Sequence, residues 1–275
     1  MFRVLLILAL ILVSTISISL ATGFPKINSK YLEIYDLTDN KILYEIDSNK
    51  EVPIASLTKI ATIITAIENI EDVDEEVVIT QEIINTLDDD VSIAGLKVGD
   101  RVTYRDLLYA SMVPSGADAV HAIAIFKFGS LDNLLEMTNE LVVRIGLSNT
   151  HFTNLIGLTE SNHYSTADEV RKLLVYALDN PLFKEIYSTK KYRLSNGLKI
   201  KSTLYKYNMS NKDIKKIIGS KTGYTSAAGY CMAALTSING HEIIIITLGA
   251  GRNGKKFYNV IDTIAIIDYL SENKK

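Results

Sequence analysis

The stretch around which the rest of the chain is organised reads Ile54-Ala55-Ser56-Leu57-Thr58-Lys59-Ile60. Its serine stands three residues before its lysine, so on a helix the two side chains share one face. A hydroxyl is a good nucleophile only when a base takes its proton, and a lysine is such a base only when burial or nearby charge keeps it neutral. Residues 60–67 are apolar almost all round, which predicts a buried helix. Ser56 and Lys59 are therefore candidates for a nucleophile and its base.

The composition is that of an ordinary globular protein. The chain has 275 residues, a net charge of -3, 47% hydrophobic and 22% charged residues, and its length suits one large domain or two small ones. The mildly acidic balance gives no electrostatic reason to expect a nucleic-acid partner. Cys231 is the one cysteine, which excludes an internal disulfide, and the four histidines are widely scattered. We therefore predict no metal site and no cofactor.

The first 21 residues have the outline of a secretory signal peptide. Arg3 precedes an apolar run from Val4 to Leu20, and Ser19-Leu20-Ala21 offers small residues at the two positions that a signal peptidase reads. The alternative is an uncleaved membrane anchor, because a run of this length is at the short end for a spanning helix. In both cases we expect the rest of the chain to be exported, with membrane contact only through this segment if it is not cleaved.

The hydrophobic pattern changes twice along the chain. Alternating apolar and polar residues predict strands towards both ends, whereas helical spacing and capping signals fill the middle. Thr103 with Asp106, and Thr166 with Glu169, are capping-box signals, and Pro181 opens a short helix. Predicted strands cover residues 31–36, 41–46, 77–79, 191–194, 198–201, 217–218, 230–235 and 243–248; predicted helices cover 56–70, 103–110, 117–128, 131–145, 166–178 and 254–270. We therefore expect a helical lobe inserted in a sheet-based domain, with a cleft where the two meet.

Two later stretches carry matching chemistry. Ser115-Gly116 lies at a break between predicted helices, where a hydroxyl can point into a cleft, although a helix cap is the ordinary explanation. Lys221-Thr222-Gly223 follows a predicted strand, and a lysine with a threonine hydroxyl there can hold a small carboxylate. Its glycine would let a ligand lie against the backbone, although a solvated lysine at a strand end is the ordinary explanation. Each stretch is weak alone, and the combination is what favours a site.

In order and structural context, the three stretches resemble the signature set of serine penicillin-binding enzymes and β-lactamases. The chain resembles the D-alanyl-D-alanine carboxypeptidases, which are low-molecular-mass penicillin-binding proteins. Residues 96–100, 104–108, 152–158 and 163–167 extend the resemblance, which covers roughly residues 31–270. It implies an α+β, β-lactamase/transpeptidase-like fold, in which an antiparallel sheet is flanked by N- and C-terminal elements and carries an inserted all-α lobe. Residues 22–275 would form a single catalytic domain, without the additional C-terminal β domain of many relatives.

The resemblance also implies a mechanism. Ser56 would attack the carbonyl between the two terminal D-alanines of a peptidoglycan stem peptide, Lys59 would take its proton, and Ser115 would relay a proton to the departing D-alanine. Water would then hydrolyse the acyl-enzyme, whereas β-lactam antibiotics, attacked at the same serine, would be released slowly. Stem peptides and β-lactams are thus the implied binding partners.

The substrate-binding residues follow from the same resemblance. Lys221 and Thr222 would hold the free carboxylate of the terminal D-alanine, and Gly223 would lie beside the ligand. The backbone N–H groups of Ser56 and Tyr224 would form the oxyanion hole, which is usually the largest stabilising contribution in such chemistry.

One position departs from the family pattern. The second motif usually reads Ser-Gly-Asn, and here the asparagine position is Ala117. Loss of the amide would cost roughly 0.5–1.5 kcal/mol of substrate binding. Because the nucleophile, the base and the carboxylate clamp remain, this predicts a slower or differently selective enzyme.

Three functions are compatible with these residues. The leading one is an exported serine-type D-Ala-D-Ala carboxypeptidase, acting in the cell wall or at the outer face of the cytoplasmic membrane. The alternatives are a β-lactamase and a catalytically weak penicillin- or wall-binding protein, the latter motivated by Ala117. Glu136 with Asn139 matches a class A β-lactamase pattern, but its helix predicts a solvated glutamate. Cys231 is expected to be a buried packing residue, and His163 a structural hydrogen-bonding group rather than a base.

Overall fold

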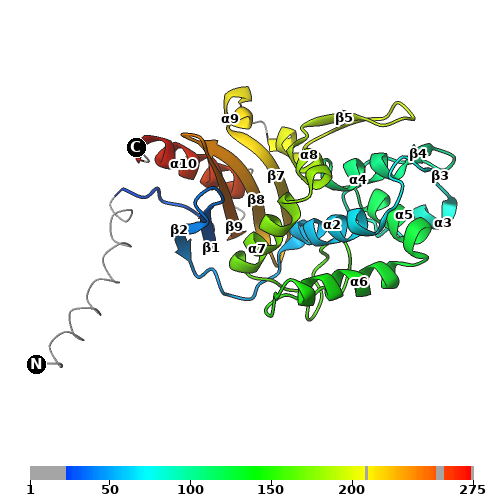
Figure 1. The fold of residues 1–275 in the computed structure, drawn as a ribbon, viewed down its shortest axis with the longest axis horizontal. Coiled ribbons are helices and arrows are strands. Elements are labelled where there is room, and N and C mark those ends of the chain that lie inside the picture. Colours follow the sequence, from blue (N-terminus) through cyan, green and yellow to red (C-terminus); the bar gives the residue numbers. More distant parts are fainter. Residues whose placement is uncertain (1–22, 208–209, 252–256, 274–275) are drawn as a thin grey trace, which may run out of the picture.

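The computed structural model describes residues 23–207, 210–251 and 257–273, so the predicted leader lies outside the described residues. A five-stranded antiparallel sheet forms the centre of the molecule, in the order β2-β1-β9-β8-β7 (Figure 1). Its strands are β1 (Tyr31–Asp36), β2 (Lys41–Ile46), β7 (Ile217–Thr225), β8 (Gly229–Ile238) and β9 (His241–Ala250). Strands from the two ends of the chain meet where β1 pairs with β9, and β7 occupies one edge.

Helices make up the middle of the chain and pack on one side of this sheet (Figure 1). The 3-10 turn η1 leads into α2, whose residues 59–67 are all buried, as the apolar run predicts. The elements of this lobe are η1 (Ala55–Thr58), α2 (Lys59–Asn69), β3 (Glu76–Val78), α3 (Gln81–Asn85), β4 (Arg101–Thr103), α4 (Tyr104–Met112), α5 (Ala117–Phe128), α6 (Leu131–Arg144), α7 (Ala167–Leu178) and α8 (Pro181–Ser188). The remaining elements are β5 (Lys191–Arg193), β6 (Lys199–Lys201), η2 (Thr203–Tyr207), α9 (Asn211–Lys216) and α10 (Tyr258–Asn273). Within the described residues, none of the helices combines the length and apolar character needed to span a membrane.

Alternation along β9 divides its side chains between the two faces of the sheet. Ile244 and Ile246 belong to the larger core, under the helical lobe, whereas Ile243 and Ile245 pack with α10. Successive side chains of a strand point to opposite faces, so one apolar run serves both layers. α10 therefore covers one face of the sheet, and α7 and α8 of the lobe contact the other. The predicted α+β architecture, with a helical lobe inserted between strands, is confirmed.

Several predicted boundaries were wrong. The α-helix starts at Lys59 rather than at Ser56, because Ala55 has a φ of 49° and residues 55–58 form a 3-10 turn. α3 lies in a stretch for which neither a helix nor a strand was predicted, and β7 runs to Thr225, well beyond the predicted residues 217–218. The predicted start of the last helix, at residue 254, lies outside the described residues, and the described helix begins at Tyr258.

The two capping-box predictions had different outcomes. At α4 the box is complete: the Asp106 N–H donates to Thr103 Oγ1 at 3.1 Å, and the Thr103 N–H donates to the Asp106 carboxylate at 3.2 Å. At α7 only the first half forms, with the Glu169 N–H donating to Thr166 Oγ1. The Glu169 carboxylate instead accepts the N–H groups of residues 148 and 149, each at 2.9 Å. A tertiary contact has replaced the local one.

Candidate active site

Ser56 and Lys59 meet at the junction of η1 and α2. Lys59 Nζ donates a hydrogen bond to Ser56 Oγ at 3.3 Å and another to the carbonyl oxygen of Ile156 at 3.0 Å. Lys59 is 2% exposed, and this burial lowers its pKa to about 7, against the opposing effect of the Asp118 carboxylate. A lysine with such a pKa is partly neutral at neutral pH and can accept a proton from the neighbouring hydroxyl.

Two glycines allow distant backbone segments to approach the turn that carries Ser56. A Cβ on Gly223 of β7 would lie 2.9 Å from the Ser56 nitrogen. A Cβ on Gly157, whose φ is +88°, would lie 2.0 Å from the Ala55 carbonyl oxygen. Only glycine permits such close approach. The turn is thus held between the edge strand of the sheet and the loop of residues 154–158.

A second serine–lysine pair joins the helix break to the same edge strand. Ser115, with a φ of 69°, lies between α4 and α5. Lys221 Nζ donates to Ser115 Oγ and to the carbonyl oxygen of Thr222, both at 2.8 Å. Lys221 is 1% exposed, and its pKa is lowered well below the ordinary lysine value by burial, and further by the charges of Lys59 and Lys206. The predicted pair of Ser56 and Lys59 and this second pair, which was not predicted as a pair, therefore lie within electrostatic range of each other.

The other predicted residues lie further along β7. Thr222 is buried, and its Oγ1 shares a 2.7 Å hydrogen bond with Thr203 Oγ1 from η2. Tyr224 is 38% exposed, and its ring packs against that of Tyr230 with centroids 4.5 Å apart. β7 pairs only with β8 in the sheet, and it packs beside η1. An edge strand of this kind can pair with an extended peptide.

The residues that follow Ser115 fix the helix break in place. Ala117, at the asparagine position of the family motif, is fully buried at the start of α5, and its N–H donates to the Ser92 carbonyl at 2.7 Å. The Asp118 carboxylate accepts N–H groups at 2.8–3.0 Å from four residues: Ala94, Gly95, Leu96 and Ala119. These bonds fasten residues 92–96 against the turn of Ser115, so Asp118 is a positioning residue that also acts on the charge of Lys59.

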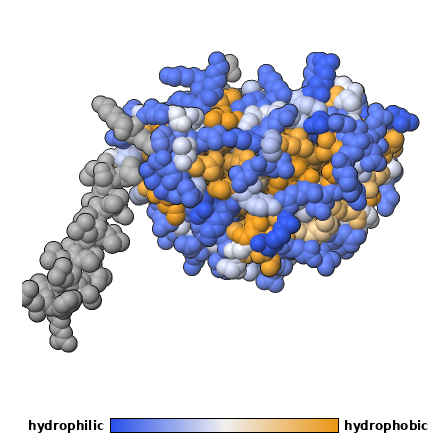
Figure 2. Space-filling view, in the orientation of Figure 1, coloured by the Kyte–Doolittle hydropathy of each residue, from blue (hydrophilic) through white to orange (hydrophobic). Residues whose placement is uncertain are grey.

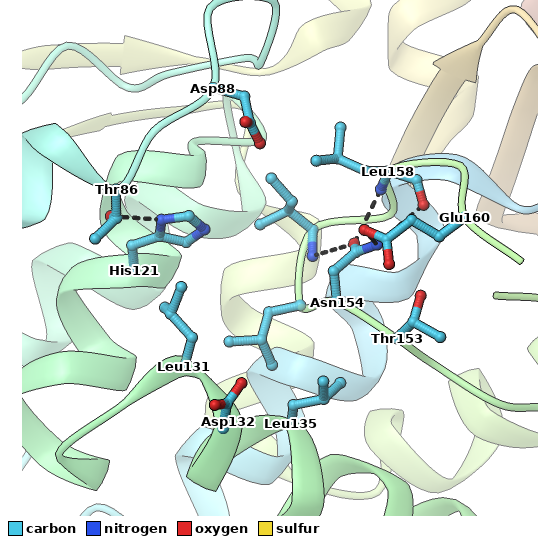
Figure 3. Close-up of a pocket in the computed structure, with 12 residues that line it drawn as sticks. Thr86, Asp88, His121, Leu131, Asp132, Leu135, Thr153, Asn154, Leu158 and Glu160 are labelled. Atoms are coloured by element: carbon cyan, nitrogen blue, oxygen red, sulfur yellow. Dashed lines mark hydrogen bonds between the residues drawn. The ribbon is translucent and has the colours of Figure 1, made fainter. Parts of the chain in front are cut away.

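An acidic cavity of about 200 Å³ adjoins the 154–158 loop (Figure 3). Three of its lining residues are acidic: Asp88, Asp132 and Glu160. Among the described residues that line it, none is a lysine or an arginine. His121 forms part of its wall, with Nδ1 2.8 Å from Thr86 Oγ1. Burial and the charge of Lys59 lower the pKa of His121 to about 4, so this imidazole is neutral at pH 7.

Three residues set aside on sequence grounds have the environments that were predicted for them. Cys231 is buried in β8, and burial raises the pKa of its thiol to about 12, which keeps it protonated. His163 is buried, with ring nitrogens 2.8 Å from Thr58 Oγ1 and 3.2 Å from the Thr153 nitrogen that donates to it. Glu136 is exposed on α6.

A group of potential metal-ligating side chains, which was not predicted, lies away from these motifs. Ligand-type oxygens and nitrogens of Asp36, Asp39 and His241 lie within 4.8 Å of one another. The Asp36 carboxylate accepts N–H groups of the following turn, and Asp39 forms an ion pair with Lys41 at 2.7 Å. These carboxylates therefore already have partners within the turn between β1 and β2.

The contributions missed by sequence reasoning come from backbone atoms and from loops. The Ile156 carbonyl, the close approach of Gly157 and the carboxylate of Asp118 have no motif of their own. The resemblance of residues 152–158 to family segments did point to the loop that supplies the first two. Thr203, the partner of Thr222, had no sequence signal, because only the tertiary structure joins η2 to β7.

The chain is similar in sequence to curated D-alanyl-D-alanine carboxypeptidases. DacF of Bacillus subtilis, a D-alanyl-D-alanine carboxypeptidase, is 30% identical over 214 residues, which is 76% of this chain and 54% of DacF. A D-alanyl-D-alanine carboxypeptidase of Streptomyces is 33% identical over 163 residues, 55% of this chain and 56% of that protein. The chain thus spans little more than half the length of these curated relatives.

The similarity to solved structures covers a larger share of both chains than the sequence similarity to these curated relatives does. A crystal structure of a Streptomyces DD-transpeptidase superposes with a TM-score of 0.78 at 26% identity, covering 89% of this chain and 97% of that one. A D-alanyl-D-alanine carboxypeptidase from Mycobacterium tuberculosis, at 22% identity and a TM-score of 0.77, covers 90% of this chain and 92% of its own and supports the fold alone. A family model described as D-alanyl-D-alanine carboxypeptidase matches residues 19–252. The chain therefore belongs to the D-alanyl-D-alanine carboxypeptidase family of peptidases.

Proposed function

We propose that this protein is a serine-type D-Ala-D-Ala carboxypeptidase that removes the terminal D-alanine from peptidoglycan stem peptides through an acyl-enzyme at Ser56. The observation that carries the proposal is the pairing of each candidate serine with a buried lysine. Lys59 contacts Ser56 and Lys221 contacts Ser115, and Gly223 places β7 directly against the turn of Ser56. We infer that the three motifs, which are far apart in sequence, border one site.

Acylation would begin at Ser56. Neutral Lys59 takes the hydroxyl proton while Oγ attacks the carbonyl carbon of the scissile bond, and the N–H groups of Ser56 and Tyr224 stabilise the oxyanion. The C–N bond then breaks, and the proton taken up by Lys59 passes by way of the Ser115 hydroxyl to the departing amine of D-alanine, which leaves Lys59 neutral again. Water hydrolyses the resulting ester, which restores the Ser56 hydroxyl and releases the shortened peptide.

The terminal carboxylate of the substrate would be bound by Lys221 and Thr222. Among the described residues, the hydrogen-bond partners of the buried Lys221 amine are a hydroxyl and a carbonyl oxygen, and neither is a carboxylate. Its pKa is lowered by burial and by two neighbouring cations, so an incoming carboxylate would relieve an unfavourable charge environment. We therefore propose that a free C-terminal carboxylate is part of the substrate.

The surroundings of Ser56 favour slow release of penicillins over a β-lactamase. Within the described part of the chain, the groups hydrogen-bonded to Ser56 Oγ are Lys59 and the Ile156 carbonyl, and neither is a carboxylate that could activate a deacylating water. Glu136 is exposed on α6. We therefore propose a long-lived penicillin adduct, in a protein that is exported to the outer face of the cytoplasmic membrane or to the wall.

The proposal is tested by incubating the protein with a synthetic stem peptide ending in D-Ala-D-Ala and measuring free D-alanine. Release that depends on Ser56 is expected, whereas binding of the peptide without release would leave a catalytically weak binding protein. Ala117→Asn separates these two cases. Restoring the amide should raise kcat/KM of an active enzyme by up to about tenfold, and should leave a protein that only binds without activity.

A further inference from the structure

A small hairpin that precedes Lys221-Thr222-Gly223 in the chain carries a concentration of positive charge. Residues 190–206 include six lysines or arginines and no aspartate or glutamate, in a chain whose overall charge is -3. These cations are Lys190, Lys191, Arg193, Lys199, Lys201 and Lys206. Strands β5 and β6 form the hairpin, which lies at the edge of the molecule (Figure 1). Figure 2 shows hydrophilic side chains projecting along this edge.

The register of the hairpin places four of these cations on one face. Lys191 pairs with Lys201 across the two strands, and Arg193 pairs with Lys199. Residues two apart on a strand point to the same side, so the two pairs share a face. All four side chains are exposed, and none of them forms a salt bridge with a described residue.

Such an arrangement opposes folding. Like charges directly opposite each other on paired strands are destabilising, and two-stranded hairpins are only marginally stable in water. A lysine on an edge strand also discourages that strand from pairing with a strand of another molecule. A single charge on the strand is enough for that role, so it does not explain two facing pairs of cations. Lys191 Nζ lies 5.2 Å from the centroid of the Tyr205 ring, which offsets part of this repulsion. The two facing pairs of cations otherwise act against the stability of the hairpin that presents them, which indicates a binding role.

The opposite face of the hairpin is anchored to the helical lobe. The Tyr192 ring stacks on that of Tyr109 in α4, with centroids 3.9 Å apart, and Ile200 is 5% exposed. At the tip, the Ser195 N–H donates to the Asp106 carboxylate at 3.0 Å. The cationic face is thus held in one orientation before any ligand arrives, which lowers the entropic cost of binding. Residues of both strands also line an open hollow of about 550 Å³.

We propose that the face formed by Lys191, Arg193, Lys199 and Lys201 binds a linear polymer of phosphodiester groups. Cations on each strand are two residues apart, or roughly 6.5–7 Å, so a chain of regularly spaced phosphates can lie along the ribbon and meet them in turn. The apolar residues Tyr192 and Ile200 belong to the anchored face and are not available for insertion into a bilayer, which favours a polymer over a lipid surface. Bound there, the polymer would hold the protein close to the surface on which its substrate is found.

The test uses the full chain and long-chain inorganic polyphosphate as the probe. Binding is measured by fluorescence anisotropy at several salt concentrations, for the unchanged protein and for a variant with four substitutions: Lys191→Gln, Arg193→Gln, Lys199→Gln and Lys201→Gln. Four phosphate contacts predict that affinity of the unchanged protein falls about 50-fold between about 50 mM and about 200 mM salt. The variant should bind at least about tenfold more weakly at low salt and lose most of this salt dependence.

A matched control removes the same number of charges elsewhere. It carries substitutions at four exposed lysines outside the hairpin: Lys26→Gln, Lys30→Gln, Lys50→Gln and Lys97→Gln. This control should bind polyphosphate as the unchanged protein does. Equal weakening of both variants, or no weakening of the hairpin variant, would overturn the proposal. Equally tight binding of the unchanged protein to vesicles of phosphatidylglycerol and phosphatidylcholine would overturn the choice of a polymer. The melting temperature of the hairpin variant should equal or exceed that of the unchanged protein, which excludes misfolding as the cause.

Discussion

The two serine–lysine pairs use the same residue types in different electrostatic surroundings. Lys59 contacts Ser56 at 3.3 Å and lies within range of the Asp118 carboxylate, which partly offsets the effect of burial on its pKa. Lys221 contacts Ser115 at 2.8 Å, and the neighbouring charges that act on it are those of two other lysines. Both amines are almost completely buried. The difference lies in which of them has a negative charge nearby.

We propose that this difference gives the two amines separate tasks. A lysine whose pKa is near 7 exchanges protons readily at neutral pH, which suits a general base. A buried lysine among cations gains most from an anion that arrives with the substrate, which suits a carboxylate-binding group. The comparison therefore predicts that substitutions in the two pairs have different consequences, and the following experiments separate them.

Removal of the two hydroxyls should have the largest effect and should distinguish the pairs. Ser56→Ala should lower kcat/KM for D-alanine release by about 10⁴-fold or more, because the nucleophile is lost, and should abolish labelling by a fluorescent penicillin. Ser115→Ala should lower kcat by about 10²-fold through loss of proton transfer, yet should still become labelled. Equal labelling of the two variants would remove the distinction between nucleophile and relay.

Substitution of the two lysines should separate base from carboxylate clamp. Lys59→Met should lower kcat/KM by about 10³-fold for a D-Ala-D-Ala peptide and for its C-terminal amide alike. Lys221→Met should lower kcat/KM by about 10²-fold for the peptide with a free C-terminal carboxylate. The effect on the C-terminal amide should be much smaller, because the amide has no negative charge for Lys221 to bind. Steady-state kinetics on the two substrates measure both ratios, and a Lys221 variant that loses activity equally on both would contradict the clamp.

The pH dependence of acylation should report Lys59. Only the neutral amine can take the Ser56 proton, so kcat/KM should rise about tenfold per pH unit below pH 7 and level off above it, given a pKa of about 7. Second-order rates of penicillin acylation, measured across this range, give the profile without interference from deacylation. A rate that stays constant from about pH 5 to about pH 8 would exclude a buried lysine as the base.

Burial of the Lys59 amine should lower the free energy of unfolding of the protein. We expect this effect to be smaller than the kinetic effects of the substitutions above. Its folded-state pKa of about 7 is below the unfolded value of 10.5, so unfolding takes up a proton between these values and wild-type stability rises with pH across that window. Lys59→Met should therefore raise the free energy of unfolding by about 2 kcal/mol near pH 7, and the advantage should shrink towards pH 10. Urea denaturation of both proteins at several pH values provides the measurement, and a destabilised variant would contradict it.

The motif side chains were predictable from sequence because each has a recognisable spacing or context. Ser56 with Lys59 is a three-residue interval, and Lys221-Thr222-Gly223 follows an apolar run that is indeed a strand. The period-two pattern also predicted the strands of the sheet, although not how far β7 extends. In these cases local physics and tertiary structure agree.

Other features required contacts that no local pattern encodes. The Ile156 carbonyl reaches Lys59 across about a hundred residues of sequence, and the close packing of Gly157 is visible only when Ala55 lies beside it. The Glu169 capping signal failed because a better partner, the backbone at residues 148 and 149, was available in the folded chain. Asp118 is similar, since three of its four N–H donors, those of residues 94–96, reach it only after this segment has folded back.

The most direct measurement is the mass of the intact protein after exposure to benzylpenicillin, followed by peptide mapping of the adduct. If Ser56 is the nucleophile, we expect a single covalent penicilloyl group, located on Ser56 and persisting long after excess antibiotic is removed. An adduct on any other residue, or an unmodified chain in a correctly folded sample, would contradict the account.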